Sequence, residues 1–236
     1  MNKSAINDLG FLTSNRYWGR GILIGTTADK IAVAYFIMGR SENSRNRYFF
    51  MEDTNIVIAP FDESKVEDPS LIIYYPIRLC GTNLIVTNGD QTDTICEYIK
   101  AGLTFEDALR TRNFEPDGPN FTPRISGLVD CVNGDYKLSI LKNIDGAGER
   151  CGRYFYEYEP VDGTGRFIHT YESDGNPLPS FEGEPWTVSI PDDFSTFTNT
   201  IWTSLDDDNK ISLCTMFIDR ESKDFDIRIL NKRMGD

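Results

Sequence analysis

Three arginines stand close together in a chain that is otherwise acidic. Arg40, Arg45 and Arg47 lie within GRSENSRNRYFF, whereas the 236 residues together carry a formal net charge of -13. An acidic surface repels nucleic acid and anionic membranes, so this local positive charge needs its own explanation. A phosphate accepts several charge-assisted hydrogen bonds, which guanidinium groups and hydroxyls such as that of Ser41 donate. The arginines therefore either bind a small anion or pair with nearby carboxylates such as Glu42.

A second group of polar residues occupies the segment VTNGDQTD, residues 86–93. Asn88 and Gly89 permit a turn with positive φ, and Thr92 or Asp93 is suited to cap a following helix. A purely structural turn explains most of this pattern. Helix N-terminal amides also attract anions, so an anion-binding role stays open beside the structural one.

Acid and base chemistry has its best candidates in two further segments. FEPDGPNFTPRISG, residues 114–127, places Glu115, Asp117 and Arg124 in a stiff loop just before a predicted strand. Such a loop presents either a carboxylate as proton acceptor with an arginine as its orienting partner, or only a surface salt bridge. Tyr74, in the apolar run LIIYYPIR, carries a hydroxyl that needs a partner if it is buried, although most such tyrosines are only core residues.

Several common catalytic motifs are absent from the sequence. It contains no G-x-x-x-x-G-K-[ST], no G-x-G-x-x-G, no H-E-x-x-H and no G-x-S-x-G segment. The one histidine, His169, has no cluster of ligands nearby, so we expect neither a metal nor another cofactor. The five cysteines are widely spaced and lack a C-x-x-C pair, which predicts reduced thiols. Without a signal region or a run of ~20 apolar residues, the chain is expected to be cytoplasmic.

Apolar patterning predicts the elements that must position these groups. Runs of β-branched and aromatic residues predict strands, and apolar spacings of three and four residues predict helices. The order of these elements implies an α+β architecture of mostly antiparallel, layered sheets. Apolar residues on both faces of KIAVAYFIM indicate a sheet covered on both sides. The expected strands cover residues 20–27, 30–39, 46–52, 55–61, 71–81, 83–90, 123–132, 136–144, 153–161, 165–173, 210–219 and 224–230, and the expected helices lie within 92–114, with a break near Gly102, and within 192–205.

Five segments of the chain follow the order seen in a known family. They are RYWGRGILIG, AYFIMGRSENSRNR, LIIYYPIR, VTNGDQTD and FEPDGPNFTPRISGLVD. In this order the chain resembles the archaeal-type inosine monophosphate (IMP) cyclohydrolase family and its bacterial relatives, closely over roughly residues 15–132 and loosely beyond them. The resemblance implies a four-layer αββα sandwich like that of N-terminal nucleophile hydrolases. It also implies a single domain over residues 1–236, whose first ~19 residues form an N-terminal extension.

The resemblance further implies an enzyme of purine biosynthesis. In the family, formamidoimidazole carboxamide ribonucleotide closes its ring when the carboxamide nitrogen attacks the formyl carbon, and water leaves to give IMP. The family's motifs place catalytic roles on Arg45 for the developing oxyanion, on Tyr74 for proton exchange with that oxygen, and on Glu115 for the carboxamide. The implied substrate-binding residues are Arg20, Arg40, Ser41, Asn88, Gly89, Thr92, Asp93, Asp117 and Arg124.

Some residue assignments keep an alternative. Tyr75 competes with Tyr74, and Asp117 competes with Glu115, because they lie one and two positions away. The pair Asn46-Arg47 has no secure counterpart in the archaeal members.

Two other functions also stay open: a non-catalytic nucleotide-binding protein, and an amide-bond hydrolase on the same fold. The hydrolase requires an N-terminal Cys, Ser or Thr nucleophile, whereas the sequence starts Met1-Asn2 and its first strand is expected near Arg20. The expected partner is a purine ribonucleotide, with no nucleic acid and no membrane, and a homo-oligomer is compatible with the sequence.

Overall fold

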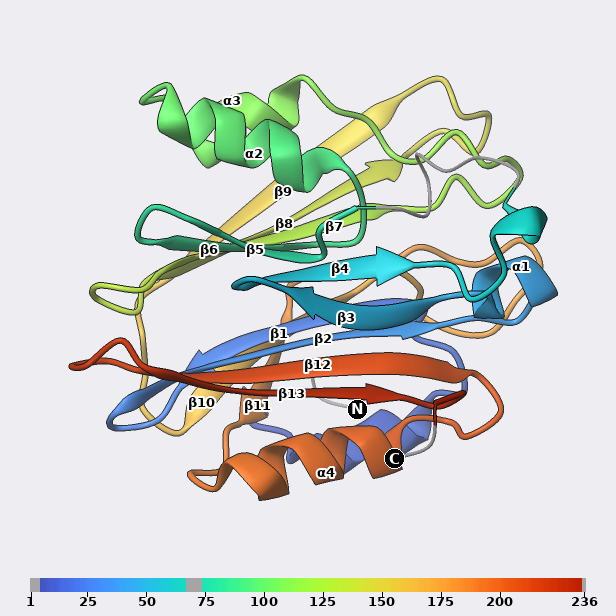
Figure 1. Cartoon of the computed structure of the whole chain (residues 1–236). Coiled ribbons are helices and arrows are strands. Elements are labelled where there is room, and N and C mark those ends of the chain that lie inside the picture. The colour runs from blue at the N-terminus through green and yellow to red at the C-terminus, as the bar shows by residue number, and fades with distance from the viewer. Residues whose placement is uncertain (1–4, 67–73, 235–236) are drawn as a thin grey trace.

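The computed structural model describes residues 5–66 and 74–234, which form two stacked β-sheets with few helices (Figure 1). The fold is therefore α+β with mostly antiparallel sheets, as the order of the elements predicted. The six-stranded sheet has the order β11-β10-β1-β2-β12-β13 and contains β1 (Arg20–Thr26), β2 (Lys30–Met38), β10 (Thr164–His169), β11 (Trp186–Ser189), β12 (Lys210–Asp219) and β13 (Phe225–Asn231). The seven-stranded sheet runs in chain order and contains β3 (Tyr48–Glu52), β4 (Asn55–Ala59), β5 (Ile77–Cys80), β6 (Asn83–Thr87), β7 (Arg124–Asp130), β8 (Tyr136–Asn143) and β9 (Cys151–Tyr158).

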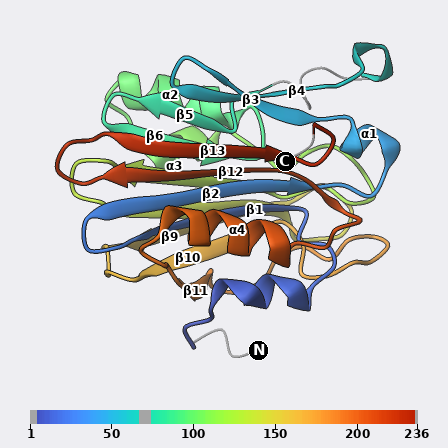
Figure 2. The same cartoon turned by 60° about the horizontal axis from the view of Figure 1, so that its bottom comes forward.

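Helices cover the outer faces of both sheets. Figure 1 shows α2 (Gln91–Lys100) and α3 (Phe105–Arg110) over the seven-stranded sheet, and α4 (Phe194–Ser204) over the six-stranded sheet. The 3₁₀ helix η1 (Leu9–Ser14) lies beside α4 (Figure 2). Two shorter helices are α1 (Glu42–Arg45) and η2 (Glu63–Lys65). None of the helices in the described part of the chain has the length and apolar character needed to span a bilayer.

One large apolar cluster joins the two sheets. It includes Ile22 and Val33 from the six-stranded sheet and Ile125 and Leu138 from the seven-stranded sheet. In β2 only Lys30 is not fully buried, because one face of this strand meets the other sheet and its opposite face meets the helical layer. Gly127 in β7 allows this close packing, since a Cβ atom there would lie 2.6 Å from the Ile24 side chain in β1.

The sequence predicted several local features correctly. Hairpins connect β1 to β2 and β3 to β4, and a break at Gly102 separates α2 from α3. In α4 the predicted apolar stripe is buried at Phe197 and Ile201, while the Asp193 side chain accepts a hydrogen bond from the Thr196 backbone N–H at 2.7 Å. Asp193 is therefore the N-cap, and the helix begins at the next residue, Phe194.

Other local predictions were wrong. The strand expected over 71–81 is only β5, and residues 71–73 lie outside the described part of the chain. Helix α2 begins at Gln91, so neither Thr92 nor Asp93 is its N-cap. The short strand β11 and the helices η1 and α1 were not predicted, because four to six residues show little periodicity.

The prediction of reduced thiols was wrong for one pair of cysteines. Cys80 in β5 and Cys96 in α2 form a disulfide with their Cα atoms 5.8 Å apart, whereas Cys131, Cys151 and Cys214 are free. Spacing along the chain does not reveal this pair, because it depends on α2 folding back over β5.

Candidate active site

The predicted site residues gather at one end of the stacked sheets. At this end β1 begins with Arg20, β2 leads into α1, and β7 begins with Arg124 (Figure 1). Tyr74 lies just before β5, and Glu115 lies in the connection from α3 to β7. Both sheets therefore contribute side chains to the same end of the molecule.

A group of charged and hydroxyl side chains, all buried except the half-buried Arg47, occupies this end. Arg20, Tyr74 and Glu115 are 8%, 4% and 7% exposed, respectively. Arg20 and Arg47 both interact electrostatically with Glu115 and with Tyr74. We call Arg20, Arg47, Tyr74 and Glu115 the central cluster.

The central cluster contains hydrogen-bonding capacity that the protein does not use. The Nε atoms of Arg20 and Arg47 are buried and have no hydrogen-bond partner among the described residues. Within the same part of the chain, no direct ion pair joins Glu115 to either guanidinium. A buried donor without an acceptor costs free energy, which a bound ligand would recover. The arrangement is therefore suited to hold a polar, anionic molecule.

Burial and neighbouring charge compete in setting the pKa values of this cluster. Burial raises the pKa of Glu115 above its usual value, although Arg20, Arg124 and Arg47 oppose the rise. Burial likewise raises the pKa of Tyr74, against the opposing effect of both cluster arginines. Burial and the nearby Arg20 lower the pKa of Arg47. Burial also acts to lower the pKa of Arg20, but Glu115 and nearby tyrosines more than offset it, so that this pKa is raised.

The structure separates Glu115 from its neighbour Asp117. The Asp117 carboxylate accepts hydrogen bonds from the Thr122 backbone N–H at 2.6 Å and from the Thr122 hydroxyl, which in turn lies 2.6 Å from the Tyr171 hydroxyl. A backbone hydrogen bond from Glu115 N–H to Thr122 O closes the same loop at 2.9 Å. Asp117 therefore holds the loop in shape, while Glu115 carries the carboxylate of the central cluster.

Tyr74 and Tyr75 are separated in the same way. The Tyr74 hydroxyl lies 3.1 Å from the hydroxyl of Tyr35 in the interior of the molecule. The Tyr75 hydroxyl donates to Glu52 at 3.1 Å, and the Arg78 guanidinium lies over its ring. Tyr74 is therefore the tyrosine that belongs to the central cluster.

The three arginines of GRSENSRNRYFF have three different environments. Arg40 pairs with Asp174 and lies over the Tyr17 ring, 5.0 Å from its centroid. Arg45 donates from Nε to the Gly39 carbonyl at 3.0 Å, and Arg47 is the arginine that interacts with Tyr74 and Glu115. The structure thus brings Arg47, rather than the predicted Arg45, into the central cluster.

The local structure explains why these arginines differ. Ser41 caps α1 in a capping box with Ser44, so a short helix that ends at Arg45 lies between the strands expected over 30–39 and 46–52. Asn46 then exchanges hydrogen bonds with the Asp62 backbone at 2.7 and 2.9 Å, which fixes the chain before β3. The sequence contained a signal that could have identified Arg47. This residue directly precedes a strand, just as Arg20 and Arg124 begin strands.

The VTNGDQTD segment contacts Arg124 and the backbone on either side of it, and so holds this arginine in place. The Asn88 side chain bridges the backbone of Pro123 and Ile125, each at 2.8 Å. Gly89 leaves room for Arg124, whose Nη1 atom would lie 2.3 Å from a Cβ atom at that position. Arg124 also binds Gln91 at 2.7 Å.

The two remaining predicted site residues of this segment serve the surrounding structure. Thr92 donates from its hydroxyl to the Tyr75 carbonyl at 2.6 Å, and so ties α2 to the segment that carries Tyr74. Asp93 pairs with Arg78. Neither residue is in the central cluster.

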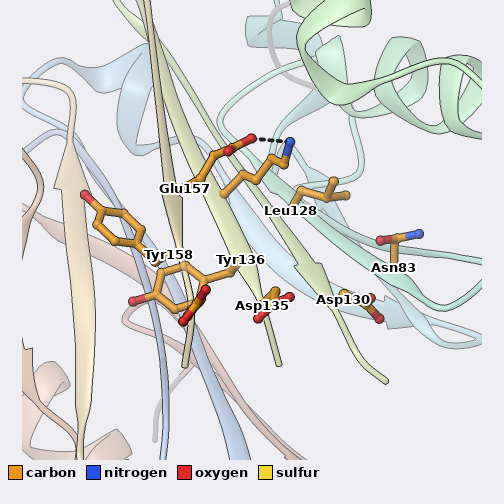
Figure 3. Close-up of a pocket in the computed structure, with 9 residues that line it drawn as sticks. Asn83, Leu128, Asp130, Asp135, Tyr136, Glu157 and Tyr158 are labelled. Carbon is orange, nitrogen blue, oxygen red and sulfur yellow. Dashed lines mark ion pairs between the residues drawn. The ribbon is translucent and has the colours of Figure 1, made fainter. Parts of the chain in front are cut away.

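A separate hollow (Figure 3) is lined by residues at the end of β7 and the start of β8, which is the opposite end of the sheets from Arg124. Its volume is about 570 Å³, and its wall includes Asp130, Asp135, Glu157 and Tyr158. Lys137 is paired with Glu157 at 2.5 Å, so the wall keeps an excess of carboxylates. This charge disfavours a phosphate, and the central cluster remains the better candidate for an anion.

The described residues include no cluster of His, Cys, Asp and Glu side chains suited to hold a metal ion. His169 is fully buried, and its ring stacks on Phe167 with centroids 5.1 Å apart. This histidine is part of the aromatic core beside Trp18.

The sequence matches one protein-family model and several known proteins. A family model described as "IMP cyclohydrolase-like protein" matches residues 17–223. A protein named IMP cyclohydrolase from Methanocella arvoryzae is 35% identical over 118 residues, which are 48% of this chain and 57% of that protein. Proteins of the same name from Methanococcus maripaludis (strain C7) and Methanosphaera stadtmanae are 36% and 31% identical, over 48% and 51% of this chain and 58% and 61% of those proteins.

These matches differ in extent. The chain spans less than two thirds of the length of the curated relatives that it matches. The family model, by contrast, covers most of the chain, from just before β1 to just before β13. The chain belongs to the IMP cyclohydrolase-like protein family.

Proposed function

We propose that the protein is an IMP cyclohydrolase that converts formamidoimidazole carboxamide ribonucleotide into IMP and water. The observation that carries this proposal is the central cluster, in which the guanidinium groups of Arg20 and Arg47 interact electrostatically with one carboxylate and one tyrosine. Both Nε donors lack a partner among the described residues, as expected of a site that binds an anionic nucleotide. The relatives named IMP cyclohydrolase support the choice of reaction.

We assign the oxyanion role to Arg47 in place of Arg45. Glu115 takes a proton from the carboxamide nitrogen as this nitrogen forms a bond to the formyl carbon. The formyl oxygen receives the Tyr74 proton, and Arg47 stabilises the negative charge that develops there. Because nucleophile and electrophile belong to one molecule, holding them in an attack geometry supplies much of the rate enhancement.

Loss of water then completes the ring and restores both side chains. The protonated Glu115 gives its proton to the departing hydroxyl, which leaves as water. The proton on the former formamido nitrogen passes to the Tyr74 oxygen as the new carbon-nitrogen double bond forms. Glu115 ends ionised and Tyr74 ends protonated, so the cluster is ready for another cycle without a cofactor.

The remaining predicted residues have binding or supporting roles in this proposal. Arg20 and Arg124 would contact the nucleotide from the buried side, and Arg40 and Ser41 would contact its phosphate and ribose from the exposed side. Residues that hold these groups in place are Asn88, Gly89, Thr92, Asp93 and Asp117.

We also propose that the two sheets with their outer helices are an αββα sandwich of the N-terminal nucleophile hydrolase type, forming one domain. In this interpretation the usual nucleophile is dispensable, because ring closure requires no covalent acyl-enzyme. An enzyme of purine synthesis with these substrates would act in the cytoplasm. A homo-oligomer is compatible with the proposal.

The test is direct. Purified protein is incubated with the formamido ribonucleotide, and the ultraviolet spectrum of IMP is followed alongside the Glu115→Gln variant. The parent should form IMP, whereas the variant should bind IMP and cyclise slowly. Binding of IMP without turnover by the parent would favour a non-catalytic nucleotide-binding protein. Activity found only after processing to a new N-terminal Cys, Ser or Thr would favour an amide-bond hydrolase.

A further inference from the structure

A second tyrosine lies behind Tyr74. Tyr35 is in β2, where its backbone pairs with Ile22 and Cys214 in the neighbouring strands. Its side chain is fully buried, and its ring stacks on Phe49 with centroids 5.6 Å apart. The Tyr35 hydroxyl lies 3.1 Å from the Tyr74 hydroxyl and so connects the six-stranded sheet to the segment before β5.

With a ligand in the central cluster, the available acceptors favour one direction for this contact. Among the described residues, Tyr74 is the hydrogen-bond partner of the Tyr35 hydroxyl. If Tyr74 were the donor, the Tyr35 proton would be buried without an acceptor, which costs free energy. If Tyr35 is the donor, its own proton is satisfied, and the Tyr74 proton is free to point at a ligand in the central cluster.

We propose that Tyr35 is a positioning residue that donates its hydrogen bond to Tyr74 and thereby directs the Tyr74 proton toward the substrate. This inference rests on the proposed cyclohydrolase function. Once Tyr74 has given its proton to the formyl oxygen, the Tyr35 hydroxyl remains as a donor to the resulting phenolate. Tyr35 itself transfers no proton and does not touch the substrate.

The charges around the two tyrosines agree with this direction. Arg20 and Arg47 interact electrostatically with both tyrosines, and Glu115 interacts with Tyr74. Burial raises the pKa of Tyr74, whereas the two arginines and the hydrogen bond to Tyr35 lower it. Loss of the Tyr35 hydroxyl should therefore make the Tyr74 proton harder to release.

The experiment compares Tyr35→Phe with Tyr136→Phe. Both substitutions remove one hydroxyl from a buried tyrosine and retain the ring, but Tyr136 lines the hollow at the opposite end of the sheets. Tyr35→Phe should lower kcat by about tenfold or more, leave KM within about twofold, and move the alkaline limb of the pH profile upward. Tyr136→Phe should retain the parent's kcat and pH profile.

A double variant gives an independent measurement. If Tyr35 acts through Tyr74, adding Tyr35→Phe to Tyr74→Phe should cause little further loss of kcat. If Tyr35→Phe does not fold, a ring-fluorinated tyrosine at position 35 keeps the shape but donates more strongly. The alkaline limb of that variant should then move downward.

The outcomes separate the two proposals. An active parent with an unchanged kcat and pH profile in the Tyr35 variant would overturn the role of Tyr35 and leave the cyclohydrolase function standing. Full additivity in the double variant would also overturn it. A parent that binds IMP but forms none from the formamido ribonucleotide would overturn both.

Discussion

At the scale of single residues, two arginines that are two positions apart in the chain have different surroundings. Arg47 interacts with Tyr74 and Glu115, whereas Arg45 donates to the Gly39 carbonyl at the end of a short helix. Arg47→Lys should lower kcat/KM by about a hundredfold, because lysine lacks the guanidinium fork that stabilises an oxyanion. Arg45→Lys is the matched control and should stay within about threefold of the parent. Steady-state kinetics of the two variants would reverse the assignment if Arg45→Lys showed the larger loss.

The pH dependence of the reaction should report Glu115. In the proposed reaction this residue must be ionised to accept the carboxamide proton, and burial raises its pKa above the ordinary glutamate value of about 4.3. The rate should therefore decline on the acid side at a higher pH than an exposed glutamate would give.

Profiles of log kcat/KM against pH test this expectation. In Glu115→Gln the small residual rate should lack the acid limb, whereas Asp117→Asn should retain the limb because Asp117 only ties the loop to Thr122. An acid limb that disappears in Asp117→Asn and persists in Glu115→Gln would move the base to Asp117.

Single residues also show which parts of the site could be predicted from the sequence and which could not. Tyr74 was identified as a hydroxyl in an apolar run, Glu115 and Arg124 as polar residues of a stiff loop before a strand, and Arg20 through the family resemblance. The structure brings all four to one end of the sheets. Arg47 was not assigned to the site because the pair Asn46-Arg47 has no secure counterpart in the archaeal members, and the sequence did not show that α1 ends at Arg45 and leaves Arg47 beside β3. Choices between neighbours such as Tyr74 and Tyr75 depend on contacts between distant strands, which spacing along the chain does not contain.

At the scale of elements, α4 depends on one buried face. Phe197 is fully buried against Phe217, with ring centroids 5.2 Å apart, whereas Phe194 in the first turn is only partly buried. Phe197→Ala should lower the free energy of unfolding by about 3–5 kcal/mol, because it removes packed apolar surface and leaves a cavity.

Urea denaturation of the Phe197→Ala and Phe194→Ala variants gives the comparison. Phe194→Ala should cost about half of that amount or less, since part of its side chain is already in contact with solvent. Equal losses in the two variants would mean that α4 buries a different face. The periodicity of 192–205 predicted this helix well because its stripe is long enough to show a period.

At the scale of the whole molecule, the two sheets share one apolar cluster. Residues of both sheets belong to it, and all three tryptophans, Trp18, Trp186 and Trp202, lie on the side of the six-stranded sheet. Tryptophan fluorescence therefore reports that side, whereas far-ultraviolet circular dichroism reports both. If the chain is one cooperative domain, both signals should follow a single transition in urea. A fluorescence midpoint that differs from the circular dichroism midpoint would mean that the sheets unfold separately.

The global arrangement was only partly predictable. The order of strands and helices was sufficient for the α+β class, because hairpins such as β1-β2 form between consecutive runs. Pairings between distant segments, such as β1 with β10 and β2 with β12, were not predictable. Several strands are apolar on both faces, so more than one partner would satisfy them equally well.

The separation between the two ends of the sheets has a practical consequence. Strands such as β1 have seven residues and carry Arg20 at one end, so the turns at their far end lie roughly 20 Å away. The turn between β12 and β13, at residues 221–224, belongs to that far end and is exposed (Figure 1). A peptide or linker inserted there could attach the protein to a support while the arginine-lined end faces the solution. The protein would then be immobilised in a defined orientation.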